Sequence, residues 1–167
     1  MSFYSIRAIE QEDIPFLWDM LYEIRSLRYV REGKTLPSRD VLQTPDLAKY
    51  VRDWGCKSDR AFIAINNETR VGAAWYRLFT ADNPGYGYVN DNTPELAIAL
   101  LPQHRNKGIG KSLILHLLEQ AKADDYQQIS LSCDPTNENA LHLYQKLGFE
   151  QVGVHIIQNW IMRKVLN

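Results

Sequence analysis

The chain has 167 residues, of which 45% are hydrophobic and 23% are charged, and its formal net charge is −1. This length fits one ordinary domain, and the apolar share is large enough for a buried core. The near balance of acidic and basic residues argues against a nucleic-acid-binding domain and against a disordered acidic chain. No apolar run approaches the roughly 20 residues that cross a bilayer, and no signal peptide is apparent. We therefore expect a cytoplasmic protein without a membrane or nucleic-acid partner.

The two cysteines, Cys56 and Cys133, do not form a Cys-x-x-Cys pair. Two such thiols predict neither a disulfide framework nor a metal site, and they suit a reducing compartment. Cys133 falls at the end of an expected strand, where a packing role is the simplest interpretation.

Hydrophobic periodicity predicts strands and helices in the first half of the chain. The stretch Asn66-Asn67-Glu68-Thr69 separates two β-type runs and indicates a hairpin. Pro15 falls in the first turn of a helical pattern, where proline is tolerated, whereas Pro45 interrupts a weaker one. The expected elements are a strand over 5–8, helices over 12–26 and 38–54, and strands over 61–65 and 71–78.

The second half alternates strands with helices after a long loop, Thr80–Pro94, which is rich in Gly, Pro, Asn and Asp. Gly148 is a typical helix stop. The expected elements are a strand over 95–100, a helix over 109–123, a strand over 128–133, a helix over 137–147, and strands over 149–152 and 158–165. This order predicts an α/β, layered (α+β) fold with a mixed sheet.

The segment Leu100–Ser112, which reads LLPQHRNKGIGKS, follows a strand and opens a helix. Glycines allow the backbone to approach a ligand, and the helix start offers unpaired N–H groups and a partial positive charge. Arg105, Lys107 and Lys111 add positive charge. Together these features predict a site for phosphate or pyrophosphate.

Three loop patterns compete for this segment. A Walker A loop needs a glycine at position 105, which is Arg, and a dinucleotide fingerprint needs one at position 113, which is Leu. The pattern [QR]-x-x-G-x-[GA] fits fully from Arg105 to Gly110. A plain helix start, with glycines that serve packing, is the alternative.

A second segment, Asn137–Phe149, reads NENALHLYQKLGF. Ala140, Leu143, Tyr144 and Leu147 share one face of its predicted helix. Tyr144 is therefore either a core aromatic or a phenol directed at a reaction centre.

In this order and spacing, the two segments resemble the GNAT superfamily of acetyl-CoA-dependent N-acetyltransferases. The resemblance covers nearly the whole chain, although only residues 95–149 carry specific motifs. It implies a single acetyl-CoA-binding domain over residues 1–167. It also implies a mixed, mostly antiparallel, splayed sheet flanked by helices, with the splay between strands 95–100 and 128–133.

The resemblance further implies the contacts of the co-substrate acetyl-CoA. Backbone groups at the end of strand 95–100 would meet the pantetheine arm, as would Asn137. Amides of the loop and the helix start would surround the pyrophosphate. The implied cofactor-binding residues are Ile98, Ala99, Leu100, Arg105, Asn106, Lys107, Gly108, Ile109, Gly110, Lys111 and Asn137.

The chemistry of acetyl transfer asks for a base and an acid. An alkyl ammonium with a pKa of about 10.4 is only about 10⁻³–10⁻⁴ free amine at pH 7, so a base is useful, and the leaving thiolate needs a proton. By resemblance, Tyr144 is the expected acid near the thioester sulfur. Glu95 is the expected base, commonly acting through water in the family; the alternative is that Glu95 only begins a strand and faces solvent.

The acceptor is expected near 18–54, 75–88 and 154–158, because such folds build their acceptor pocket there. Four basic residues of the first stretch would recognise an acidic group or form a solvated helix face: Arg25, Arg28, Arg31 and Lys34. An aromatic and acidic set would suit a cationic amine: Trp75, Tyr76, Tyr86, Tyr88, Asp82, Asp91 and Glu95.

The predicted function is transfer of an acetyl group from acetyl-CoA to a primary amine, by direct attack in a ternary complex. The acceptor is a small-molecule amine or a peptide N-terminus, and a homodimer is possible. The alternative is a non-catalytic acetyl-CoA-binding sensor or interaction module on the same fold. A nucleotide-binding P-loop protein is disfavoured by Arg at position 105.

Overall fold

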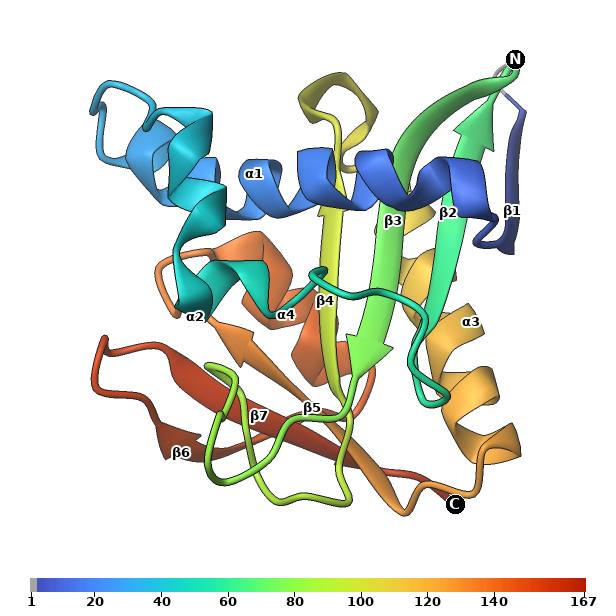
Figure 1. Cartoon of the computed structure of the whole chain (residues 1–167), viewed down its shortest axis with the longest axis vertical. Coiled ribbons are helices and arrows are strands. Elements are labelled where there is room, and N and C mark those ends of the chain that lie inside the picture. Colours follow the sequence, from blue (N-terminus) through green and yellow to red (C-terminus); the bar gives the residue numbers. More distant parts are fainter. Residues whose placement is uncertain (1–2) are drawn as a thin grey trace. The chain divides into compact units, whose positions relative to one another are not determined.

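The structure is a computed structural model that describes residues 3–167 (Figure 1). Its strands form one seven-stranded sheet in the order β1-β2-β3-β4-β5-β7-β6, in which β4 and β5 run parallel. This confirms the predicted mixed, mostly antiparallel sheet with helices, whereas the splay between two of its strands stays a prediction. The elements are β1 (Tyr4–Ala8), η1 (Gln11–Asp13), α1 (Ile14–Arg31), η2 (Arg39–Gln43), α2 (Pro45–Ala48), β2 (Arg60–Asn66), β3 (Thr69–Arg77), β4 (Glu95–Leu100), η3 (Pro102–His104), α3 (Ile109–Ala123), β5 (Gln128–Cys133), α4 (Glu138–Lys146), β6 (Glu150–Val154) and β7 (Trp160–Val165).

The chain divides into two compact units, each built from two segments. The first unit comprises Met1–Trp75 and Ile98–His116, and the second comprises Tyr76–Ala97 and Leu117–Asn167. Within the described residues, no helix has the length and apolar character needed to cross a membrane.

In the first unit, the predicted hairpin is confirmed. Asn67 and Glu68 join β2 to β3, and both have positive φ (49° and 69°). Two consecutive left-handed residues are typical of the tight turn whose twist matches that of paired strands. β1 pairs antiparallel with β2, from Tyr4 opposite Asn66 to Ala8 opposite Phe62.

The first helix is longer than the sequence predicted. α1 continues to Arg31 rather than ending at residue 26, and a 3-10 turn precedes it. Pro15 lies in its first turn, as expected. Leu17, Met20 and Leu21 are buried, so they mark the face of α1 that joins the core.

A buried ion cluster ties the start of α1 to the strands of the first unit. Asp13 is fully buried, and its carboxylate accepts hydrogen bonds from Arg7 on β1 and Arg70 on β3, each at 2.6 Å. It also accepts the backbone N–H of Glu10 at 2.7 Å. Chiefly because of the hydrogen bond from Arg7, the pKa of Asp13 is held well below its usual range.

The prediction of a helical region over residues 38–54 is wrong in its extent. The structure has only the 3-10 turn η2 and the four-residue α2 there. Pro45 begins α2 instead of interrupting a helix, because a missing N–H and a fixed φ suit a first helical position.

In the second unit, apolar and polar residues alternate along β5. Ile129, Leu131 and Cys133 are buried in the core, and Gln128, Ser130 and Ser132 alternate with them. β7 pairs antiparallel with β5 along its whole length and with β6, where the register shifts between Gln151 and Gly153.

The ends of α4 and the loop before β4 follow the sequence predictions. Gly148 has a φ of +94° just after α4, as expected of a helix stop. Residues 80–94 form no strand, apart from an isolated bridge between Thr80 and Asn83. At Gly87 a Cβ atom would lie 2.5 Å from the carbonyl carbon of Leu131, so this loop packs its backbone directly against β5.

Candidate active site

In the first unit, the segment that carries the predicted phosphate loop runs from the end of β4 to the first turn of α3. Asn106 and Gly108 have positive φ (61° and 84°), which turns the backbone into the helix. Nothing lies within 4 Å of where a Cβ of Gly108 would be, so this glycine is required by its φ and not by lack of space.

The start of α3 presents backbone donors of the kind that bind anions. Ser112 N donates to Gly108 O at 3.2 Å, which closes the first turn of the helix. The N–H groups of Ile109, Gly110 and Lys111 precede this bond, so they have no acceptor within the helix. Lys107, Gly108 and Lys111 are exposed. The local arrangement of donors and positive charge therefore fits a phosphate group.

Arg105 has a different place from the one expected of a cofactor ligand. Its Nε donates to Leu100 O at 3.0 Å, and its Nη2 lies 3.3 Å from Glu23 Oε2 on α1. Its backbone N–H donates to Pro102 O at 3.3 Å. These contacts hold the loop against β4 and α1. Because the backbone N–H of Arg105 already donates to Pro102 O, the amides that could bind a phosphate lie further along the chain.

A histidine at the same loop gains a partner that the sequence did not reveal. His104 Nδ1 lies 3.2 Å from the hydroxyl of Tyr4 on β1, and the two rings meet edge to face. This contact fixes the turn η3 that leads into the loop.

In the second unit, Tyr144 is packed in α4 rather than exposed. Only 9% of its surface is exposed, and its ring meets Phe149 edge to face at 6.0 Å. Burial raises the pKa of Tyr144 far above its usual range, with a smaller contribution from Cys133. The phenol is therefore protonated at neutral pH and can donate a hydrogen bond.

Asn137 caps α4. Its Oδ1 accepts the backbone N–H of Ala140 at 3.4 Å, a typical N-cap contact. The Nδ2 group is the part of this side chain that suits a bound amide carbonyl.

Glu95 begins β4 and is only 4% exposed. The alternative in which it faces solvent is therefore wrong. Glu95 lies directly opposite Ser130 of β5 in the parallel register, next to the bond from Ser130 N to Pro94 O at 3.0 Å. The other expected backbone ligands of β4 are partly or largely buried: Ile98, Ala99 and Leu100.

The expected aromatic wall is only half present. Trp75 and Tyr76 are core residues: Trp75 Nε1 donates to Tyr50 O at 3.0 Å, and the Tyr76 hydroxyl donates to Asp124 at 2.5 Å. Tyr86 and Tyr88 are half-buried, and the Tyr88 hydroxyl donates to Asp91 at 2.5 Å. The loop thus offers two aromatic rings and the exposed carboxylates of Asp82 and Asp91 to a cation.

The basic residues of α1 and of the segment just after it are engaged locally. Arg28 and Lys34 both pair with Glu32, at 3.1 and 2.7 Å, and Arg25 lies over the ring of Tyr29. These contacts favour a solvated helix face over recognition of an acidic group.

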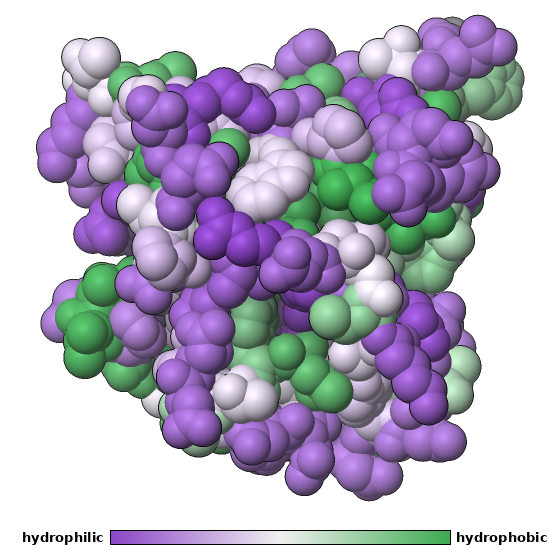
Figure 2. Space-filling model, viewed as in Figure 1, coloured by the Kyte–Doolittle hydropathy of each residue, from purple (hydrophilic) through white to green (hydrophobic). Residues whose placement is uncertain are grey.

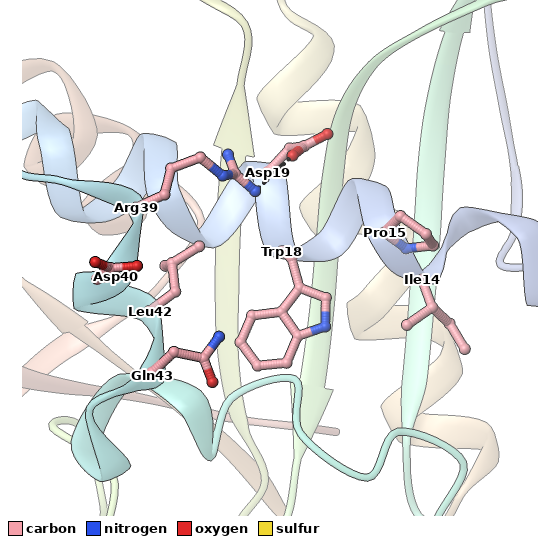
Figure 3. Close-up of a pocket in the computed structure, with 8 residues that line it drawn as sticks. All are labelled: Ile14, Pro15, Trp18, Asp19, Arg39, Asp40, Leu42 and Gln43. Carbon is pink, nitrogen blue, oxygen red and sulfur yellow. Dashed lines mark hydrogen bonds and ion pairs between the residues drawn. The ribbon is translucent and has the colours of Figure 1, made fainter.

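A cavity of about 520 Å³ opens between α1 and η2 in the first unit. Figure 3 shows Trp18 projecting into it, with Leu42 and Gln43 on one side and Ile14 and Pro15 on the other. Arg39 and Asp19 pair at its edge, at 3.0 Å. Figure 2, which has the same view as Figure 1, shows residues of intermediate and high hydropathy in this region, surrounded by hydrophilic ones.

Comparisons with known proteins agree with this arrangement. Residues 18–149 match the profile described as the acetyltransferase (GNAT) family. The chain is 29% identical over 113 residues to N-alpha-acetyltransferase 50 of Danio rerio, which covers 67% of this chain and 56% of that protein. It is 26% identical to the prophage-derived N-acetyltransferase YokL of Bacillus subtilis, over 89% of this chain and 77% of that protein. The match therefore spans little more than half the length of the first of these relatives.

Among solved structures, PaiA N-acetyltransferase of Thermoplasma acidophilum, in complex with coenzyme A, is similar with a TM-score of 0.69. The alignment covers 98% of this chain and 99% of that one, at 18% identity, so the likeness concerns the fold. Because the family profile matches most of the chain, the chain belongs to the acetyltransferase (GNAT) family, whose members are N-acetyltransferases with acetyl-CoA as co-substrate, as its motifs predicted.

Proposed function

We propose that the protein transfers an acetyl group from acetyl-CoA to a primary amine, by direct attack in a ternary complex, and that residues 1–167 act as one domain. The observation that carries this proposal is the family match over residues 18–149. It includes the loop before α3, whose exposed donors and lysines suit the pyrophosphate of the co-substrate.

The binding of acetyl-CoA is proposed for three groups of residues. The N–H groups of Ile109, Gly110 and Lys111 would bind the pyrophosphate, aided by the positive charge of Lys107, with Asn106 and Gly108 shaping the turn. The Asn137 amide and backbone groups of Ile98, Ala99 and Leu100 would bind the pantetheine arm. Arg105 would act by holding the loop, since its side chain contacts Leu100 and Glu23.

For the chemical step, Glu95 is the proposed base and Tyr144 the proposed acid. Glu95 is a buried carboxylate, which suits proton transfer in a site with little water. The phenol of Tyr144 stays protonated because burial raises its pKa, so it can donate a hydrogen bond to the leaving thiolate.

The acceptor is proposed to be the α-amino group of a peptide or a small cationic amine. The name of the Danio rerio relative, N-alpha-acetyltransferase 50, supports the first class. The half-buried Tyr86 and Tyr88, with Asp91, support a cation in either class.

The test is to incubate the protein with acetyl-CoA and a panel of peptides and small amines, and to detect by mass spectrometry the products that carry one added acetyl group. We expect product with at least one acceptor. Gly110→Glu should abolish it by adding bulk and negative charge at the pyrophosphate site. Tyr144→Phe should lower kcat by about 10²-fold with little change in cofactor affinity.

Two results would contradict the proposal. Binding of acetyl-CoA without turnover on any acceptor would support the non-catalytic sensor instead. A folded Gly110→Glu variant with unchanged affinity would show that acetyl-CoA binds elsewhere.

A homodimer is also proposed. Val154 and Ile156, in β6 and the turn after it, are 53% and 89% exposed, and β6 is an edge strand of the sheet. Natural edge strands that expose apolar side chains are commonly covered. Sedimentation should give about twice the 19.3 kDa chain mass, and a monomer at all concentrations would refute the dimer.

A further inference from the structure

Three polar side chains form a row across neighbouring strands of the second unit. In the parallel register of β4 and β5, Glu95 lies opposite Ser130. In the antiparallel register of β5 and β7, the same Ser130 lies opposite Arg163. Residues directly opposite one another lie on the same face of the sheet, and in an antiparallel pair such as Ser130 and Arg163 their Cβ atoms are about 4.5–5.5 Å apart. Ser130 is therefore flanked by a carboxylate on one strand and a guanidinium on the other.

The hydroxyl at the centre of this row is buried without a hydrogen bond. Ser130 is fully buried, and among the described residues its Oγ has no hydrogen-bond partner. The Nε of Arg163 is also buried without a hydrogen-bond partner among the described residues, although the Nη1 of the same side chain donates to Gln128 Oε1 at 3.4 Å. Burying a polar group without a partner is costly, so such a group in a folded protein calls for a ligand or a water molecule.

The neighbours of Ser130 on the same strand face behave differently. Gln128 Nε2 donates to Thr93 Oγ1 at 2.8 Å, and Ser132 Oγ accepts from Asn159 Nδ2 at 3.2 Å. The two outer polar side chains of β5 are thus held by protein partners, and the central one is not.

We propose that the Ser130 hydroxyl holds the water molecule through which Glu95 receives the proton of the acceptor amine. This inference rests on the proposed function, in which Glu95 is the base. The ammonium passes one proton to the water oxygen while the water passes one of its own protons to the Glu95 carboxylate. The products are the free amine, the neutral carboxylic acid and an unchanged water. Ser130 is a positioning residue: it exchanges hydrogen bonds with the water and neither gains nor loses a proton overall.

The test compares Ser130→Ala with Ser132→Ala, which removes a hydroxyl from the same face of the same strand. We expect Ser130→Ala to lower kcat at pH 7 by about 10–100-fold, within the range of impaired proton transfer, with KM for acetyl-CoA changed less than twofold. The loss should shrink at higher pH, where more of the acceptor is already free amine. Ser132→Ala should keep kcat within about twofold, and the thermal midpoint of Ser130→Ala should not fall.

The outcomes separate this inference from the function on which it rests. If Ser130→Ala retains full kcat while Glu95→Gln does not, the hydroxyl has no such role and the base assignment stands. A kcat loss that is equal at every pH, with a lowered thermal midpoint, would mean that Ser130 is only structural. If Glu95→Gln itself retains full kcat, Glu95 is not the base, and the inference fails with it.

Discussion

Two buried carboxylates of the molecule, Asp13 and Glu95, have different surroundings. Asp13 in the first unit receives two arginines and a backbone N–H, all at 2.6–2.7 Å. Glu95 in the second unit begins a strand and lies opposite a serine whose hydroxyl is not hydrogen-bonded to the described residues. A carboxylate that two arginines hold in its ionised form cannot readily accept a proton, so Asp13 is not suited to act as a base. Asp13 therefore stabilises the fold, and Glu95 is the candidate for chemistry.

Glu95→Gln gives the sharpest contrast. It keeps the shape of the side chain but removes the base, so kcat should fall by about 10²–10⁴-fold. The affinity for CoA should stay within about twofold, as measured by titration calorimetry. Equal loss of kcat and of CoA affinity would mean that Glu95 shapes the site instead.

Asp13→Asn should lower the stability of the fold and leave kcat unchanged. Removing one partner of a buried ion cluster typically costs about 3–5 kcal/mol. Here Arg7 and Arg70 are 34% and 39% exposed and can be rehydrated, so we expect about 2–3 kcal/mol. Chemical denaturation measures the loss. The kcat per folded molecule should be unchanged, and a selective loss of kcat would break the comparison.

The same cluster predicts how stability depends on pH. The pKa of Asp13 is held well below its usual range by Arg7, so its ionised form stabilises the folded state. This contribution is complete above the unfolded pKa of about 3.9 and is lost as the pH falls through the lower folded value. The stability gap between wild type and Asp13→Asn should therefore be constant from pH 5 to 7 (roughly) and shrink below about pH 4. A gap that widens in acid would contradict this assignment.

The smallest expected effect concerns one arginine of the cluster. In Arg70→Met, Asp13 keeps Arg7 and the Glu10 N–H, so we expect a loss of about 1 kcal/mol. Glu119→Gln, which removes the partner of the exposed Lys122, is the matched control and should change stability by less than about 0.5 kcal/mol. An Arg70→Met loss no larger than that of the control would mean that Arg7 alone supports Asp13.

Sequence reasoning succeeded where local chemistry decides the structure. The turn at Asn67 and Glu68, the stop at Gly148 and the loop before α3 depend on a few adjacent residues, so they were predictable. Residues 38–54 have only a weak hydrophobic periodicity and no comparable local signal. The prediction that Pro45 interrupts a helix there was wrong, because Pro45 begins α2.

The residues around Glu95 could not be predicted in the same way. That Ser130 lies opposite Glu95 and Arg163 depends on the register of three strands distant in sequence. The alternation of Gln128, Ser130 and Ser132 with apolar residues was the one available signal. This alternation indicates that one face of the strand is polar, but it does not indicate which residues of other strands lie beside that face. Burial of Glu95, which decided against the solvent-facing alternative, likewise depends on the fold.

Calorimetric titration of the purified protein with acetyl-CoA and with CoA tests the central claim most directly. The account predicts binding of both, with dissociation constants in the micromolar range and one site per chain. A folded sample that binds neither would contradict it, because the loop from Arg105 to Gly110 would then keep the family pattern without its function.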